Sequence, residues 1–165
     1  MRAEIEVYTY KEGVLSKVAH DLRIRVQDVS VGGSAEALTV RVQLGGLQVM
    51  CAQKDGVDDP RALSDKDKRK IENTMRKEVL HVANHPHALF EGRAVREGDH
   101  AAIEGTLSLH GRQRPLRLSL QRRGDAFEGE FMVHQPDYGI TPYTAMLGAL
   151  KVKADVRVRV RAFEG

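Results

Sequence analysis

Apolar and polar residues alternate along most of this chain with a period of two, most clearly between residues 101 and 121. Two alternating segments there flank the polar run His110–Pro115. A period of two with one apolar face is typical of half-buried antiparallel strands. Gly111 supplies a turn, and Pro115, which lacks an N–H, suits the start of the second strand. The pattern therefore predicts a β-hairpin.

The same alternation predicts further strands at residues 5–10, 22–26, 38–44, from 90 onward, 127–133 and 150–162. The apolar run Leu47–Cys51 is expected to extend the strand at 38–44 past a kink at Gly45-Gly46. The segment 150–162 is predicted to be the longest strand, because thirteen residues at about 3.3 Å each span roughly 43 Å.

The period changes between residues 64 and 82, where one narrow apolar stripe lies among charged residues. Ser64 and Asp67 resemble a capping box, which is typical of a helix N-terminus. The stripe follows at spacing four and consists of Ile71, Met75 and Val79. The pattern predicts a surface helix that ends by His85-Pro86.

About eight strands with one apolar face each must bring those faces together, as a sandwich or as a closed barrel. The length of the last strand favours the barrel. We therefore predict an all-β fold with one helix, namely an elongated antiparallel eight-stranded β-barrel in a single domain, residues 1–165. The helix packs outside this barrel or caps one end. Gly105 and Gly129, at inward positions, either kink strands at barrel corners or leave space for a ligand.

Composition and charge say little about binding partners, but they favour one cellular compartment. With 26 basic and 23 acidic residues, the net charge of +3 excludes neither a nucleic-acid partner nor a neutral ligand. Cys51 is the only cysteine, so no intrachain disulfide is expected. The first ten residues do not resemble a signal peptide, and no apolar run approaches the ~20 residues that span a bilayer. We expect a cytoplasmic protein without membrane insertion.

Three segments resemble motifs of the YceI-like family. Glu104–Leu116 is similar to its G-x-L-T-L-H-G-x-T-x-P-V hairpin, His85–Phe90 to its Y-P-x-I-x-F segment, and Asp137–Ile140 to its D-F-G-I loop. The resemblance implies a lipocalin-like barrel whose apolar interior is associated with polyisoprenoids or related long-chain amphiphiles. Aromatic residues make up 5% of this chain and tryptophan is absent, so aliphatic side chains would provide most contacts with such a ligand.

Several histidines and carboxylates offer chemistry other than lipid binding. His81, His85 and His87 have spacings found in zinc sites, but the predicted helix end separates them, and we expect no metal or cofactor. His20-Asp21 and His134 with Asp137 offer acid–base groups without a nucleophile-elbow motif, and therefore no enzymatic activity is expected. Asp137 is expected to close its loop through its side chain next to Gly139.

Two surface features complete the sequence-based picture. Arginines lie opposite apolar rows, on the face that a barrel turns to solvent, and no aromatic residues alternate with them for base stacking, so no nucleic-acid partner is expected. These arginines are Arg23, Arg25, Arg157, Arg159 and Arg161. Met146 and Leu147 form either an apolar lip at the barrel mouth or core packing beneath a loop.

We therefore expect non-enzymatic binding of a long-chain apolar small molecule, isoprenoid or fatty-acid-like, inside the barrel. The expected ligand-binding residues are Leu22, Ile24, Leu107, Leu109, Phe131, Tyr138, Tyr143, Met146, Val152 and Val156. Tyr138, Tyr143 or His20 is expected to meet the polar head of the ligand. Two alternatives remain: a solid barrel that acts as a stress-related or interaction module, and an enzyme acting on such a lipid. A monomer and a homodimer both agree with the sequence.

Overall fold

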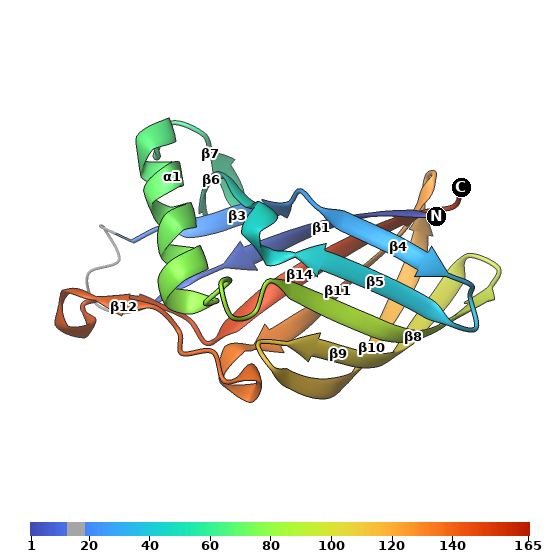
Figure 1. Cartoon of the computed structure of the whole chain (residues 1–165). Coiled ribbons are helices and arrows are strands. Elements are labelled where there is room, and N and C mark those ends of the chain that lie inside the picture. Colours follow the sequence, from blue (N-terminus) through green and yellow to red (C-terminus); the bar gives the residue numbers. More distant parts are fainter. Residues whose placement is uncertain (13–18) are drawn as a thin grey trace.

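The computed structural model of the chain describes residues 1–12 and 19–165. An antiparallel sheet curls around one apolar interior, and a helix lies across one end of it while both chain termini lie at the other end (Figure 1). In the order in which they lie side by side, the strands are β4 (Val29–Gly33), β5 (Leu38–Gln43), β8 (His87–Glu97), β9 (His100–Leu109), β10 (Arg112–Arg123), β11 (Ala126–His134), β14 (Asp155–Phe163), β1 (Arg2–Thr9), β3 (Asp21–Val26), β6 (Leu47–Lys54) and β7 (Val57–Asp59).

The hairpin predicted at residues 101–121 is confirmed as β9 and β10. Its two turn residues, His110 and Gly111, have φ angles of 54° and 77°. Two consecutive left-handed residues are characteristic of a type I′ turn, whose twist matches that of the flanking strands. The register places Leu116 opposite Gly105 and Leu118 opposite Ile103.

A bent two-stranded ribbon joins the two edges of the curled sheet. β3 continues into β4 and β5 continues into β6, so that β3 pairs with β6 and β4 with β5. At the bend, Gln27 N–H donates to the carbonyl of Gly46 and Gln43 N–H donates to that of Asp28, both at 3.0 Å. A 3-10 turn at Leu44–Gly46 makes the predicted kink. If β3 and β4 are counted as one bent strand, and β5 and β6 as another, the sheet has the predicted eight long strands and the short edge strand β7.

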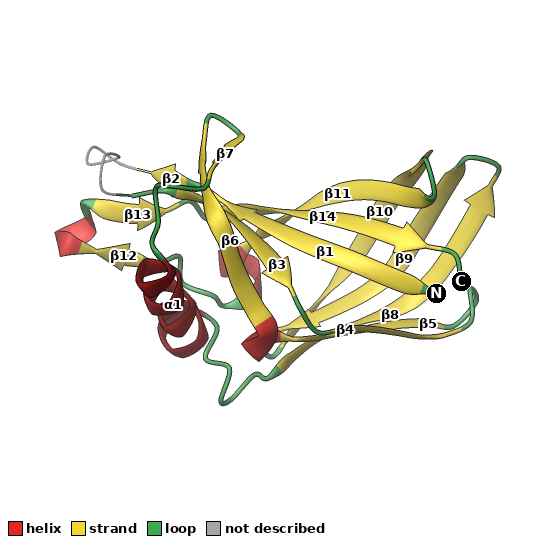
Figure 2. Ribbon diagram, turned by 90° about the horizontal axis from the view of Figure 1, so that it is seen from above, coloured by secondary structure: helices red, strands yellow, loops and turns green. Residues whose placement is uncertain are grey.

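The prediction of one continuous strand at residues 150–162 is wrong. The chain first forms the short strand β13 (Leu150–Val152), which is not part of the main sheet, and then β14, which is. At the break, Gln135 Nε2 donates to the carbonyl of Lys153 at 3.0 Å, and Lys153 N–H donates to that of Tyr10 at 2.8 Å. These bonds turn β13 toward a small second sheet, which it forms with β12 (Thr144–Ala145) and β2 (Lys11–Glu12) (Figure 2). The longest strand is β10.

Helix α1 (Asp65–Thr74) begins at the predicted capping box, in which the Ser64 hydroxyl accepts from Asp67 N–H at 3.1 Å. It continues as a π-helical turn over Met75–Val79. Two contacts fix it to the bent ribbon: Glu72 Oε2 accepts from the Val49 N–H at 2.9 Å, and Arg76 Nε donates to the carbonyl of Gly45 at 3.0 Å. In the described part of the chain, no helix is both long and apolar enough to cross a membrane.

The sequence of Val14–His20 is compatible with a helical turn or an irregular plug. Residues 14–18 of this segment lie outside the described residues. The sequence Lys11-Glu12-Gly13 is typical of a turn, but Lys11 and Glu12 form strand β2. Its partner is β13, with Lys11 opposite Val152 and Glu12 opposite Lys151. The small sheet therefore combines residues from near both ends of the sequence.

Candidate functional site

The curled sheet encloses an apolar cavity of about 510 Å³. This volume lies within the range of about 300–1,000 Å³ that is usual for small-molecule sites. Its wall is made by the inward-facing residues of the long strands, because every second side chain of a strand points to the same face. Representative wall residues are Ile5, Ile24, Val40, Phe90, Phe131 and Val158. The interior is therefore hollow, which does not favour the solid-barrel alternative.

Charged residues in the cavity lining are cationic and stand at the two ends. Arg2 belongs to the end that carries the chain termini, whereas Lys11, Lys70 and Lys151 belong to the end that carries α1 and the small sheet. Among the lining residues that the structure describes, there is no aspartate, glutamate, serine or cysteine. The hydroxyl groups of the described lining are those of Thr9, Thr74 and Tyr143.

Eight of the ten predicted ligand-binding residues line this cavity. They are Leu22, Ile24, Leu107, Leu109, Phe131, Tyr143, Val152 and Val156. His20, expected near a polar head, also lines it. Tyr138 is buried in a core cluster with Val133 and Ile140. Those two residues line the cavity, but Tyr138 does not. Met146 is 62% exposed at the tip of the β12–β13 hairpin and does not reach the cavity either.

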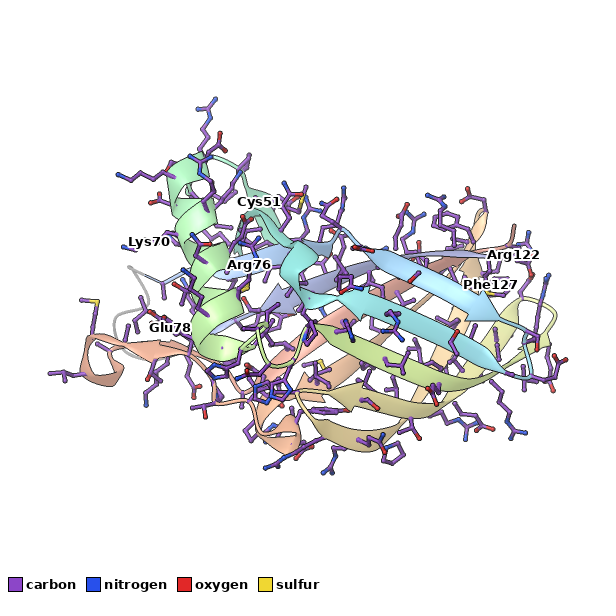
Figure 3. All side chains as sticks on the ribbon, in the orientation of Figure 1. Cys51, Lys70, Arg76, Glu78, Arg122 and Phe127 are labelled. Atoms are coloured by element: carbon purple, nitrogen blue, oxygen red, sulfur yellow. The ribbon has the colours of Figure 1, made fainter. Side chains whose placement is uncertain are left out.

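The helix contributes lining residues that sequence reasoning assigned to packing only. Ile71, Met75 and Val79, the predicted stripe, all reach the cavity, and Lys70 and Thr74 accompany them. Of the two placements that the sequence left open for the helix, outside the barrel or capping one end, the structure supports the cap (Figure 1). The spacing of four residues was the signal that identified this face, but it could not show that the face closes a hollow space. Figure 3 shows Lys70, Arg76 and Glu78 along this helical segment, far from Arg122 and Phe127.

Gly105 and Gly129 leave no space for a ligand. A Cβ on Gly105 would lie 2.2 Å from the carbonyl oxygen of Glu91, and a Cβ on Gly129 would lie 2.3 Å from that of Ser119. Neither glycine is part of the lining. Of the two explanations that the sequence left open, the structure does not support space for a ligand, because a Cβ at either position would overlap the backbone of a neighbouring strand.

The histidines that the sequence grouped together separate in the fold. His87 Nδ1 lies 3.2 Å from Gln43 Oε1, whereas His81 and His85 turn toward His110, with ring centroids 5.6 and 4.4 Å from it. Nε2 of His110 is buried without a hydrogen-bond partner. Burial is the largest cause that lowers the pKa of His110, and the nearby His85 is the next. A hydrogen bond to the Tyr138 backbone acts in the opposite direction.

This histidine cluster does not have the arrangement of a metal site. Within the described ranges, no group of three or more histidine, cysteine, aspartate or glutamate side chains could hold a metal ion. The cluster instead packs the loop after the π-helical turn against the β9–β10 turn.

The acid–base pair considered at His134 and Asp137 does not form. His134 Nδ1 lies 2.6 Å from Asp155 Oδ1, and Asp137 faces Arg114 at 3.8 Å. The role predicted for Asp137 in closing its loop is also wrong, since backbone groups close it. Gly139 has a φ of 70°, and its N–H donates to the carbonyl of Pro136 at 3.0 Å. A left-handed glycine at this position ends the short 3-10 turn that precedes it.

The outward arginines are largely paired with carboxylates. Arg157 Nη1 lies 2.9 Å from Glu130 Oε1, while Arg159 and Arg161 share Glu128 at 3.1 and 2.8 Å. Burial would raise the pKa of Glu128, but hydrogen bonds from these two arginines outweigh it and lower that pKa. Cross-strand pairs of this kind stabilise a sheet and leave little unpaired positive charge for phosphates. The expectation that no nucleic acid binds stays a prediction.

The model of the YceI-like domain family matches residues 5–162, so the chain belongs to the YceI-like family. The family predicted from the hairpin and from Asp137–Ile140 is thereby confirmed. None of the curated proteins compared matches the chain.

Solved structures with the same fold come from several bacteria. BcnA of Burkholderia cenocepacia has a TM-score of 0.63 at 11% identity, over 96% of this chain and 94% of that chain. A polyisoprenoid-binding domain from Saccharophagus degradans, implicated in plant cell wall breakdown, has a TM-score of 0.61 at 14% identity, over 96% and 91%. The YCEI protein of Campylobacter jejuni has a TM-score of 0.53 at 12% identity, over 86% and 84%. At these identities the likeness shows the lipocalin-like fold.

Proposed function

We propose that this protein binds a long apolar chain of isoprenoid type lengthwise inside the barrel, without transforming it chemically. The observation that carries the proposal is the continuous apolar lining, which extends from Ala3 and Ala162 near one end to Leu150 and Val152 near the other. An apolar interior of this length is complementary to an extended hydrocarbon chain. Membership of the YceI-like family and the likeness to a polyisoprenoid-binding domain support the same choice of ligand.

The driving force for such binding is the removal of hydrocarbon from water. Each buried methylene contributes about 0.8 kcal/mol, so a chain of about fifteen carbons has a gross contribution of about 12 kcal/mol. The loss of translational and conformational freedom offsets part of it. What remains is sufficient for tight binding, and slow dissociation would carry the ligand through purification.

The helix end of the lining holds most of its polar side chains, whereas the end with the chain termini contributes Arg2, and this difference supports one orientation of the ligand. His20 and Tyr143 belong to the lining at the end formed by α1 and the small sheet, together with Lys11, Lys70 and Lys151. The middle of the wall is aliphatic and aromatic. A hydrogen-bonding head group would therefore lie at the helix end, with the apolar chain directed toward Ile103, Leu116 and Ala162.

The proposal is tested by mass spectrometry of an organic extract of the purified protein. Leu107→Trp is the informative variant, because Leu107 lines the cavity and a larger ring there occupies ligand volume. Thr106→Trp is its matched control: Thr106 is the preceding residue of the same strand, is exposed, and points to the opposite face. We expect near-stoichiometric isoprenoid lipid in the wild type and in Thr106→Trp, and at least a severalfold lower content in Leu107→Trp.

Two results would contradict the proposal. Extracts without stoichiometric lipid, together with no uptake of added long-chain isoprenoids by the delipidated protein, would remove it. Equal lipid content in both tryptophan variants, each with a native circular-dichroism spectrum, would place the lipid somewhere other than this cavity.

A further inference from the structure

The tip of the β12–β13 hairpin exposes two apolar side chains. Leu147 is fully exposed and Met146 is 62% exposed. Met146, Leu147 and Gly148 have consecutive φ angles of 53°, 56° and 86°. The left-handed region costs free energy for residues that carry a Cβ, so the backbone holds these two side chains in solvent against its own preference. Isolated strain of this kind, coupled with exposed apolar surface, indicates an interaction surface.

One lysine lies beside this apolar tip, and others share its end of the molecule. The Cε atom of Lys151 lies 3.4 Å from the position that a Cβ on Gly148 would take. Lys11 stands opposite Val152 in the small sheet, and Lys70 reaches the same end of the cavity from α1. Figures 1 and 2 both show α1 and the small sheet at the end of the molecule away from the termini.

Two carboxylates share this end of the molecule with the lysines. Glu12 stands opposite Lys151 in the small sheet, and Asp21 Oδ1 accepts from the backbone N–H of Lys11 at 2.8 Å. Lys153, whose N–H donates to the carbonyl of Tyr10, adds a fourth cation next to β13. Among these named groups cations outnumber carboxylates, so an apolar tip is flanked by net positive charge.

We propose that this surface, defined by Met146, Leu147, Lys70, Lys151 and Lys153, docks the protein on an anionic lipid bilayer. Apolar side chains beside lysines match the interfacial region of such a bilayer, where headgroups attract the cations and the acyl boundary accepts the apolar residues. The inference rests on the proposed function in one respect. The cavity reaches this same end at Tyr143, Leu150 and Lys151, so a docked protein exchanges its lipid directly with the membrane.

The test is cosedimentation of the full chain with vesicles of phosphatidylcholine alone and of equal parts phosphatidylcholine and phosphatidylglycerol. Leu147→Asn removes the apolar side chain without adding charge, and asparagine tolerates the left-handed conformation that Leu147 adopts. Met132→Asn is the matched control, since Met132 is 56% exposed on strand β11 and lies outside both the tip and the cavity. We expect the wild type and Met132→Asn to bind the anionic vesicles, more weakly as salt increases.

Leu147→Asn is expected to bind those vesicles about tenfold more weakly than the wild type. Leu147→Ser provides a second variant if Leu147→Asn does not fold. Absence of binding to the anionic vesicles, equal binding to neutral ones, or equal losses in Met132→Asn would overturn the docking surface. Dimers of the wild type that Leu147→Asn converts to monomers, with no vesicle binding, would assign the tip to contact between two copies and also overturn it. Lipid content measured by extraction is independent of all these outcomes, so the failure of docking and the failure of lipid binding are told apart.

Discussion

Gly92 on β8 stands directly opposite Gly105 on β9, and neither position has room for a side chain. A Cβ built on Gly92 would lie 2.8 Å from the Cα of Gly105, and one built on Gly105 would lie 2.6 Å from the Cα of Gly92. The two backbones can approach each other this closely because both residues lack a Cβ. This glycine pair is therefore part of what curls the sheet around its interior.

Gly105→Ala should destabilise the protein by about 1–3 kcal/mol or more, because the added methyl overlaps the backbone of β8 and the strands must separate. Gly45→Ala is the control, since its Cβ would meet only Val82 Cγ1 at 3.8 Å, an ordinary contact, and should change stability by less than about 0.5 kcal/mol. Urea denaturation measures both. Similar stabilities for the two variants would show that the close approach of β8 and β9 is not required.

Helix α1 should loosen in Glu72→Ala. Val49 is only 2% exposed, and its N–H loses its acceptor when the Glu72 carboxylate is removed, which costs about 1–3 kcal/mol. Hydrogen exchange of residues 65–80 should accelerate with that loss. Glu72→Gln keeps an acceptor oxygen and should recover most of the stability, whereas Lys77→Ala, at an exposed position of the same helical segment, should have little effect. Wild-type exchange in Glu72→Ala would argue against this anchor.

Stability should fall on acidification through the environment of His110. Burial together with His85 lowers the pKa of this histidine in the folded state, whereas a histidine in the unfolded state has a pKa of about 6.5. The unfolded state therefore binds more protons below that pH, and the stabilising contribution present above it is lost as the pH falls toward the lower folded pKa. Thermal melts between neutral pH and pH about 5 should show a shallower decline in His110→Asn than in the wild type or in His100→Asn. Identical slopes in all three proteins would exclude His110 as the group responsible.

Cys51 should react slowly in the native protein. Its side chain is buried on β6, and burial raises the pKa of the thiol, so that less thiolate is present at mildly alkaline pH. Labelling by a disulfide reagent at pH about 8 should be at least about tenfold slower in the native than in the urea-unfolded protein. The melting temperature should not depend on reductant. Rapid stoichiometric labelling of the native protein would contradict the buried position of this thiol.

Sequence periodicity was sufficient for most of the long strands, because each of them has one apolar face and the alternation repeats it at every second position. It missed β4 and the short strands β2, β7 and β12. It also located the cavity wall, since Leu107, Leu109 and Phe131 point inward for the same reason that they alternate with polar residues. The helix was found from its capping box and its stripe at spacing four. Strand alternation, the capping box and the helical stripe each depend on residues close together in the sequence, so the sequence alone is sufficient to predict them.

The errors arose where distant groups decide the structure. The alternation of 150–162 gave no sign of the Gln135 and Tyr10 contacts that divide it at Lys153. Gly105 was ambiguous because its neighbour Gly92 belongs to another strand, and only their pairing shows that the space between them is closed. Tyr138 and Met146 were assigned to the ligand from a loop whose path the sequence does not specify. Such features depend on which segments meet, not on the pattern within one segment.

The position of β14 in the sheet has a consequence for the order of events during folding. β14 pairs with β11 on one side and with β1 on the other, and β1 begins at Arg2 whereas β14 ends at Phe163. Pairing between strands so far apart in sequence has a high loop-closure cost and is typical of slow folding. Until β14 inserts, the remaining strands form two separate ladders connected by the bent ribbon, and no continuous wall surrounds the interior. The enclosed space therefore comes into existence only with the last strand of the chain, so any molecule held there is either trapped at that moment or admitted afterwards through an end of the barrel.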